Sequence, residues 1–554
     1  MIAEAFASAF ASVFTPAYRS NDKTVLPAGH QAVQTRMPPI DICAKDVLST
    51  LQALDGNSAA GADNVHPLLL KQCAPGLAYP LYLLFRQSIR ESKLPAAWKS
   101  SLVIPIFKKG SRYDALNYRP ISLTSVTCKC LERIIVRHLT AYLEDNNILT
   151  DHQFGFRAGR STIDQLLLVY NDVAGQVDSG SVVDLIMFDF AKAFDVVSHP
   201  ILLTKLHLLG VHVSVVHWIE DFLVGRHMTV LVKGKQSSPH LITSGVPQGS
   251  VIGPILFLVF INHIASNLTC QYKIFADDLK IYMRIRHDSQ ANYVLDSQTC
   301  QRYIDMLQRT AESWCLSLNQ NKCVVIRFQR KLHSLPPPHY LIAQAPIQVV
   351  NSHSDLGVII DSDLKFHKHI AVTVCKAAGL AQNILKSTVC RSPEFMMTLF
   401  SAHVRPVIEY CSCVWHTRYV GDLRLLESVQ RRWTKRVAGL TNLDYGSRLK
   451  ALNQYSIQGR LLRADLIQCW KVFNGQCSIV PTDLFVLAPS GTRGHRYKIH
   501  HSRAQTDVRA RSFVMRCTES WNALPDEVVG ENTLTRFKAA LAASLGDALF
   551  AYQT

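Results

Sequence analysis

Three aspartates lie where strands are predicted to end or turn, and carboxylates gathered at such places can hold divalent cations. Asp189 follows a nearly continuous apolar run that begins at residue 181 and predicts a buried strand. Asp277 and Asp278 lie between two short apolar runs, which predict a hairpin with both aspartates in its turn. Two Mg²⁺ ions held by carboxylates can neutralise the attacking and leaving oxygens of a nucleotidyl transfer. If the three strands are neighbours, these aspartates are expected to form such a site.

Each of these features also has an ordinary structural explanation. Paired aspartates are common in hairpin turns because aspartate tolerates turn geometry. Asp189 alone could equally cap the end of a strand. Carboxylates about 4 Å apart repel one another by roughly 4 kcal/mol at an effective dielectric constant near 20. A cluster of three is therefore expected mainly where cations fill it.

The segments around the aspartates predict a core of mixed helices and strands. Strand-like and helical patterns alternate from about residue 120 to residue 330. Gln290–Trp314 carries a helical apolar stripe, and residues 322–328 form a further strand-like run. Beyond residue 365 the pattern is mainly helical, whereas residues 1–40 show no strong period and are predicted to be a tail.

The length, net charge and apolar stretches of the chain indicate what kind of partner it binds. Its 554 residues exceed the length at which one core usually stops growing, so several subdomains are expected. The formal charge of +17 favours a polyanion, either nucleic acid or an anionic membrane. The longest apolar stretch, Val251–Ile261, is too short to span a bilayer, and residues 1–14 lack the basic start of a signal peptide. Nucleic acid is therefore the favoured partner.

The fifteen cysteines are scattered through core-like segments, which indicates a reducing, intracellular setting. Cys411, Cys413 and His416 have the types of metal ligands, but a fourth ligand at suitable spacing is missing. A zinc site is not expected there.

Six segments in a fixed order resemble the successive motifs of one enzyme family, the reverse transcriptases of non-LTR (LINE-type) retrotransposons. They are Asn117–Leu123, Phe188–Asp195, Gly245–Ser250, Phe275–Asp278, Leu318–Lys322 and Leu356–Val358, the last of which resembles the primer-grip element. Phe-Ala-Asp-Asp, in place of Tyr-x-Asp-Asp, is itself typical of this group. Three further segments look like the family's fingers region and the ending of jockey-like elements: Ala59–Asp63, Ile104–Lys108 and Trp521–Pro525.

The resemblance implies an α+β, right-hand polymerase fold with fingers, palm and thumb, a βαββ-type palm sheet and a mainly helical C-terminal region. It divides the chain into an N-terminal tail, the fingers and palm, a primer-grip region with the start of the thumb, and a helical, basic thumb with a C-terminal extension. These parts are expected at residues 1–40, 41–335, 336–390 and 391–554.

The resemblance also implies an activity, the copying of an RNA template into DNA from a DNA primer or target DNA. The substrates would be dNTPs and the cofactors two Mg²⁺ ions, with Mn²⁺ as an alternative. Asp189 and Asp277 would bind both metals, and Asp278 would complete the site. Lys322 would be the general acid that protonates the departing pyrophosphate.

Further residues are expected to hold the incoming nucleotide. By resemblance, the ring of Phe194 would exclude a ribose 2′-hydroxyl by steric overlap, although Phe194 could equally be ordinary core. Arg119 could grip phosphate oxygens bidentately, and Lys108, or Lys109 beside it, could serve the same task.

A glycine-rich loop, Gly245–Gly249, would let the backbone approach the nucleotide closely. Gln248 and Gly249 are the contacts expected from it. The alternative is an ordinary turn.

Two basic segments, residues 424–436 and 490–516, are expected to contact the backbone of an RNA–DNA hybrid, although charge runs are more often simply solvated. An RNA-copying RNA polymerase is a rival interpretation, which Phe194 disfavours. A catalytically inactive, element-derived nucleic-acid-binding protein is the other, which the intact carboxylates disfavour.

The 40 residues before the fingers region are too few for the family's N-terminal endonuclease, so that activity is expected to come from another protein or chain. The family's chemistry implies a nuclear and cytoplasmic ribonucleoprotein, without a signal peptide or transmembrane segment.

Overall fold

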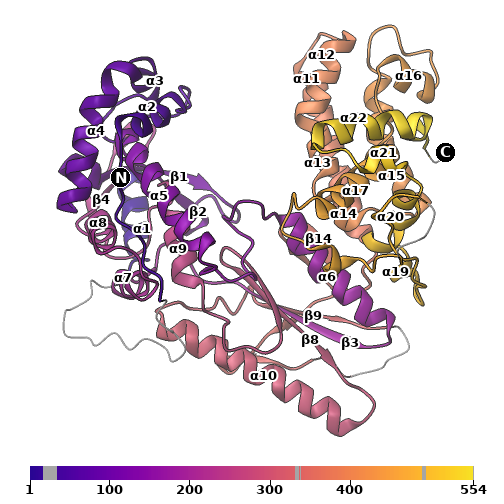
Figure 1. Ribbon diagram of the computed structural model, residues 1–554, viewed down its shortest axis with the longest axis horizontal. Helices are drawn as coiled ribbons and strands as arrows, with labels where there is room; N and C mark the ends of the chain where they lie inside the picture. Colours follow the sequence, from indigo (N-terminus) through magenta and orange to yellow (C-terminus); the bar gives the residue numbers. More distant parts are fainter. Residues whose placement is uncertain (16–33, 331–335, 337, 490–493, 553–554) are drawn as a thin grey trace.

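The computed structural model describes residues 1–15, 34–330, 336, 338–489 and 494–552 (Figure 1). An N-terminal group of helices with a small sheet lies on the left of the view, and a C-terminal group of helices lies at the upper right. A second, central sheet lies between and below them, with the long helix α10 along its lower side. Within the part of the chain that the structure describes, no helix is long and apolar enough to cross a membrane.

The central sheet has the strand order β12-β9-β3-β8-β7. Its middle strand β3 (Val182–Phe188) pairs antiparallel with β8 (Asp278–Ile285) on one side and with β9 (Val324–Phe328) on the other. β7 (Gln271–Phe275) and the short β12 (Gln348–Val349) form the edges. All seven residues of β3 are buried, as its apolar sequence predicts for a strand covered on both faces.

Two hydrophobic cores cover the two faces of this sheet. Successive side chains of a strand point to opposite faces. Ile186 and Phe188 of β3 therefore pack into the first core, whereas Leu185 and Met187 pack into the second. The first core takes in the N-terminal helices and α10. The second takes in α6 (Thr162–Asp178) and the C-terminal helices.

The N-terminal region contains the second sheet. Its strand β1 (Ser100–Phe107) lies between β2 (Tyr118–Leu123) and β4 (His227–Val232), and the short β5 (Lys235–Gln236) and β6 (His240–Leu241) also pair with β4. The main helices of this region are α2 (Ala44–Gln52), α4 (Ala74–Glu91), α5 (Val126–Asp145), α7 (His199–Leu208), α8 (Val213–Leu223) and α9 (Gly253–Ile261).

The prediction of a tail over residues 1–40 is wrong for its first part. Ile2–Ala11 forms the helix α1, which packs on the sheet of the N-terminal region and buries Ala7 and Phe10. Its buried side chains recur at helical spacing, so one apolar stripe covers the sheet. Part of the predicted tail, residues 16–33, lies outside the described residues.

The two helical predictions are confirmed. α10 (Gln290–Ser313) begins after Ser289, whose side chain accepts a hydrogen bond from the backbone N–H of Asn292. Beyond residue 365 the structure is helical. The main elements are α11 (His367–Ser387), α12 (Pro393–Leu399), α13 (Arg405–Glu409), α14 (Ser412–Trp415), α15 (Val420–Thr434), α16 (Tyr445–Ala451), α17 (Ile457–Phe473), α20 (Phe513–Asn522) and α22 (Leu534–Leu545).

Candidate active site

Strands β3 and β8 bring the predicted aspartates to one end of the central sheet. Phe188 of β3 is paired with Leu279 of the antiparallel strand β8. Asp189, directly after Phe188, and Asp278, directly before Leu279, therefore lie at the same end of the two strands. The strands that carry these aspartates are therefore neighbours, which is the condition under which the aspartates were expected to lie together.

The turn between β7 and β8 lies one residue earlier than predicted. Phe275 pairs with Asp278, so the turn residues are Ala276 and Asp277, and Asp278 already begins β8. Ala276 has a φ of 55°, which is the backbone conformation that a tight two-residue hairpin needs at its first position. The two aspartates thus have different settings, one in the turn and one on the strand.

The three carboxylates influence one another electrostatically. Burial raises the pKa of Asp277 above its ordinary value, and the negative charge of Asp189 adds to the effect. Loss of surrounding water and the charge of Asp277 raise the pKa of Asp278 to about 6, although part of the Asp278 side chain stays exposed. Positive charge placed among these groups would lower both pKa values.

Lys322 supplies some of that positive charge. Its Nζ lies 2.7 Å from Oδ2 of Asp189, and the two side chains are 40% and 31% exposed. The backbone N–H of Asn319 donates to the carbonyl of Asp189 over 2.7 Å, which anchors the segment that carries Lys322 to the end of β3. The predicted general acid and the predicted metal ligand are therefore ion-paired.

The aspartates fit a divalent cation by type and charge, although they do not form a finished coordination sphere. Among the described residues, no group of three or more His, Cys, Asp or Glu side chains is arranged to hold a metal ion. Carboxylate oxygens are nevertheless the ligands that Mg²⁺ prefers. Burial is the main cause of the raised pKa values of Asp277 and Asp278, and the negative charges of neighbouring aspartates add to it.

One cavity of about 770 Å³ brings together almost all of the predicted site residues. It opens beside the ends of β3 and the β7–β8 turn. Its lining includes Lys108, Arg119, Asp189, Phe194, Gln248, Gly249, Asp277 and Lys322. Asp278 instead lines a neighbouring cavity of about 440 Å³, which it shares with Asp189 and Lys322.

Phe194 has both a core contact and an open side. Its ring stacks on that of Phe257 of α9, with 4.2 Å between ring centroids and 14° between planes. Phe257 is fully buried, whereas Phe194 is half-buried and lines the cavity. Phe194 thus contacts the core through Phe257 and also lines the cavity, and exclusion of a 2′-hydroxyl by its ring stays a prediction.

The glycine-rich loop approaches β2 closely. Gly249 has a φ of 118°, and a Cβ there would lie 2.4 Å from the carbonyl oxygen of Ser122. The side-chain amide of Gln248 donates to Asp195 over 2.8 Å. Burial raises the pKa of Asp195 to about 6. Gln248 thus lines the cavity while its amide N–H is already engaged by a neighbouring side chain.

Two cationic side chains face the carboxylates across the cavity. Lys108 follows β1, and Arg119 lies on β2, which pairs with β1. Burial, together with the charges of Arg119 and Lys322, lowers the pKa of Lys108. Both side chains remain exposed enough to meet an anion.

The neighbouring cavity is bounded by a hairpin of β13 (Ser352–Asp355) and β14 (Val358–Asp361). Leu356 and Gly357 form its turn with φ values of 45° and 85°. This is the segment that resembles the primer-grip element, and it lies across the cavity from Asp189 and Asp278.

The sequence reasoning missed a loop beside the active site, residues 150–160. Phe156 of this loop lines the larger cavity and is 55% exposed. Oε1 of Gln153 accepts hydrogen bonds from the backbone N–H groups of Gly155 (2.8 Å) and Ala276 (2.9 Å), which ties the loop to the β7–β8 turn. In the structure Gly155 explains this close approach, since a Cβ there would lie 2.4 Å from the nitrogen of Ala276.

Other expectations concern the C-terminal helices. Cys411 and Cys413 are buried, and Nδ1 of His416 contacts Asp465 at 2.6 Å, so this trio serves packing and hydrogen bonding. In the basic run 490–516, three arginines make contacts within the protein, and the expectation of polyanion contact does not hold for them. They are Arg509 with Asn171, Arg511 with Asp507, and Arg516 with Asp465.

The other basic segment keeps its charges on the surface. Leu426 and Val429 of α15 are buried, as its apolar stripe predicts. Arg432, Lys435 and Arg436 line a groove of about 560 Å³ between α15 and α11.

The chain resembles known proteins over much of its length. Residues 106–352 match the family described as reverse transcriptase (RNA-dependent DNA polymerase). The chain is 27% identical over 421 residues to a probable RNA-directed DNA polymerase from transposon X-element of Drosophila melanogaster, covering 74% of this chain and 45% of the relative. It is 29% identical over 346 residues to the RNA-directed DNA polymerase from mobile element jockey of Drosophila funebris, covering 61% and 37%. The chain thus spans less than half the length of these relatives.

Residues 106–352 are therefore similar to the reverse transcriptase family, and the residues that line the larger cavity lie within this region. The relatives that the chain matches come from non-LTR retrotransposons, among them jockey, X-element and R1. The resemblance seen in the sequence motifs is therefore confirmed.

Proposed function

We propose that the chain is an RNA-directed DNA polymerase, derived from a non-LTR retrotransposon, that extends a primer along an RNA template by two-metal nucleotidyl transfer. One observation carries the proposal. A single cavity holds Asp189 and Asp277 opposite Lys108 and Arg119, with the ring of Phe194 on its wall. The reaction needs negative groups that bind cations and positive groups that bind a triphosphate. It also needs an apolar surface against which the sugar can lie.

Asp189, Asp277 and Asp278 would hold the divalent cations. Bound there, Mg²⁺ would supply Lewis-acid stabilisation of the charge that develops on the phosphate and the leaving group. Mn²⁺ has the same preference for oxygen ligands. Asp189 would exchange its ion pair with Lys322 for the cation, which frees the ammonium group of Lys322.

The remaining residues of the cavity have separable roles. Arg119 and Lys108 bind the triphosphate, and their charges attract the nucleotide to the cavity. Lys322 donates a proton to the departing pyrophosphate, and its contact with Asp189 holds its ammonium group beside the cavity. Phe194 excludes the 2′-hydroxyl, while Gln248 and Gly249 shape the floor beneath the nucleotide.

The larger architecture supports a right-hand arrangement. The central sheet would be the palm, the N-terminal sheet and helices the fingers, and the C-terminal helices the thumb, with the predicted divisions near residues 40, 335 and 390. The groove at Arg432, Lys435 and Arg436 has the charge needed to follow the backbone of the template–primer hybrid. Use of genomic target DNA would place the protein in the nucleus.

The rival with most support is a nucleic-acid-binding protein that has lost catalysis. The intact carboxylates and the nucleotide-sized cavity disfavour it, since binding alone requires neither. An active polymerase and an inactive binding protein can be distinguished by measuring primer extension.

The test is primer extension on an RNA template with dNTPs and Mg²⁺. We expect the parent to extend the primer and the double variant Asp277→Ala, Asp278→Ala to lose at least roughly 10³-fold in rate, the scale seen when a group of catalytic residues is removed. Asp363→Ala, which changes an exposed aspartate, is the matched control and should extend like the parent. A folded parent that binds the hybrid without extending the primer would favour the binding protein.

A further inference from the structure

Phe156 combines three properties that folding alone does not explain. It is a bulky aromatic residue with 55% of its surface exposed. Its φ of 56° lies in the left-handed region, where residues other than glycine, asparagine and aspartate are strained. Its ring lines the same cavity as Phe194 and the carboxylates.

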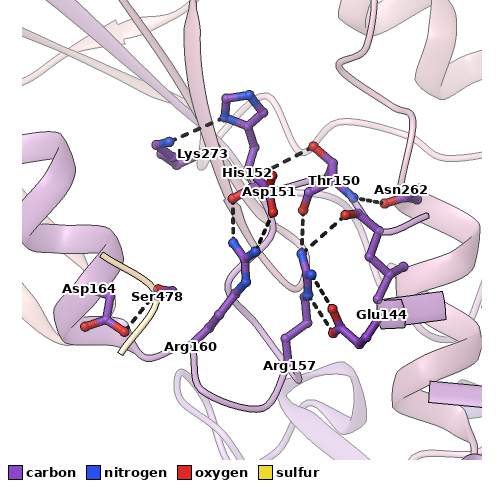
Figure 2. Close-up of polar contacts among 11 residues, drawn as sticks. Glu144, Thr150, Asp151, His152, Arg157, Arg160, Asp164, Asn262, Lys273 and Ser478 are labelled. Carbon is purple, nitrogen blue, oxygen red and sulfur yellow. Dashed lines mark hydrogen bonds and ion pairs between the residues drawn. The ribbon is translucent and has the colours of Figure 1, made fainter. Parts of the chain in front are cut away.

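The loop that carries Phe156 is anchored on both sides of it (Figure 2). The guanidinium of Arg157 donates to both carboxylate oxygens of Glu144, at 2.9 and 2.5 Å, and to the carbonyl of Thr150 at 2.7 Å. Arg160 donates to the carbonyl and carboxylate of Asp151, both at 2.6 Å. These contacts come from residues on either side of the strained position.

The same loop is joined to the catalytic hairpin. The backbone N–H of Phe154 donates to Ile274 of β7, and the N–H of Ile274 donates to His152, both over 2.8 Å. Strained backbone persists only where the surrounding contacts determine it. Phe156 is therefore held at a fixed place relative to the β7–β8 turn and Asp277.

The ring of Phe156 meets Phe194 edge-on. Their centroids lie 6.1 Å apart with 78° between planes, whereas Phe257 stacks flat against Phe194. Phe257 supports Phe194 from the protein interior, and Phe156 limits its movement from the cavity side.

We propose that Phe156 is a second specificity-determining residue of the nucleotide pocket: its ring restrains Phe194 and narrows the space open to a 2′-hydroxyl. The inference rests on the proposed polymerase function and adds a residue to it. The class of ligand discriminated is the nucleoside triphosphate, deoxyribose against ribose.

The test is single-nucleotide incorporation by the full chain with one dNTP and the matching rNTP, measured as kcat/KM for each. Phe156→Asn removes the ring and suits the positive φ. We expect the dNTP-over-rNTP preference to fall by about tenfold or more, with kcat/KM for the rNTP rising above that of the parent. A gain with the wrong substrate cannot arise from damage to the fold.

Two further variants distinguish a specific effect of the Phe156 ring from a general loss of stability. Phe156→Tyr keeps the ring and should keep the preference of the parent. Phe366→Asn makes the same change at another positive φ, 62°, beside α11, where the side chain packs on the second core. It should lower the melting temperature and leave the preference unchanged, whereas Phe156→Asn should not lower the melting temperature.

The outcomes distinguish this inference from the proposed function. An active parent whose preference is unchanged in Phe156→Asn would overturn the role of Phe156 alone. A parent without polymerase activity would overturn the proposed function and the inference with it.

Discussion

The two hydrophobic cores lie against opposite faces of one sheet, and they differ in what they support. The first core lies largely within the residues matched by the reverse transcriptase family and carries the loops and helices around the carboxylates. The second is formed by α6, which packs on the other face of the sheet, and by the helices beyond residue 352, several of which pack on α6. The region matched by the family therefore contains the candidate active site. Part of the hydrophobic core that covers its sheet, however, comes from residues beyond 352.

Each face also buries one acid with one base and one tyrosine. On the first face, Asp184 accepts hydrogen bonds from two nitrogens of Arg327 and from the hydroxyl of Tyr340, all at 2.7 Å. On the second face, Asp355 accepts from Lys280 at 2.5 Å and from Tyr170 at 2.7 Å.

The group around Asp355 lies closer in sequence to the predicted metal-binding aspartates than the group around Asp184 does. Lys280 lies two residues after Asp278, and Asp355 directly precedes the turn at Leu356. Asp184 lies five residues before Asp189, nearer the other end of β3. The second-face group therefore joins the candidate active site to the β13–β14 hairpin, and the first-face group does not.

Removal of the second core should have the largest effect. A chain that ends at residue 352 would lack the C-terminal helices that pack on α6, and would therefore expose the apolar side chains of α6 that belong to the second core. We expect this chain to lose cooperative unfolding and to aggregate, because large exposed apolar surfaces associate. Calorimetry and size-exclusion chromatography test this. A soluble, cooperatively unfolding chain of 352 residues would show that the first core suffices by itself.

Breaking the two buried ion pairs should have a smaller and contrasting effect. Asp355→Ala and Asp184→Ala each leave a buried cation without its partner, which costs roughly 3–5 kcal/mol of unfolding free energy. At a temperature where both variants are folded, only Asp355→Ala should also slow primer extension, because Lys280 is on the strand of Asp278. Denaturant titration gives the free energies, and primer extension gives the rates. An equal loss of rate in Asp184→Ala would contradict this contrast.

Much of the first core could be predicted from the sequence, because its local patterns are strong. The apolar run before Asp189 and the hairpin around Asp277 gave the strands, although the turn is shifted by one residue. The ion pair of Lys322 with Asp189 could not be predicted, because it joins residues 133 positions apart. Phe156 was missed because its importance comes from a cavity wall that only the fold assembles.

The second core was harder to predict because its patterns are ambiguous. In β3 both faces are apolar, so alternation does not reveal that two different cores meet there. Charge was also misleading: Arg509 and Arg516 belong to a basic run, yet they donate to Asn171 and Asp465 within the protein. The basic side chains at the groove of α15 lie on the surface, and their contact with an RNA–DNA hybrid stays a prediction.

The smallest expected effect concerns the protonation of one buried histidine in the second core. His369 of α11 is buried, and its Nδ1 accepts a hydrogen bond from the backbone N–H of Ile359 in the β13–β14 hairpin at 3.2 Å. Burial lowers the pKa of His369 to about 4, and the nearby charge of Lys376 adds to the effect. The unfolded chain therefore takes up a proton near pH 6.5 that the folded chain refuses until about pH 4.

Stability from this group is complete above pH 6.5 and is lost as the pH falls toward 4, by about 1–2 kcal/mol at pH 5. His369→Gln removes this titration and should reduce the fall in unfolding free energy between pH 7 and pH 5 by about that amount. His217→Gln, which changes an exposed histidine of α8, should retain the fall of the parent. If His369→Gln kept that fall, acid sensitivity would have to arise elsewhere, and the junction of α11 with the hairpin would not be the acid-sensitive part of the second core.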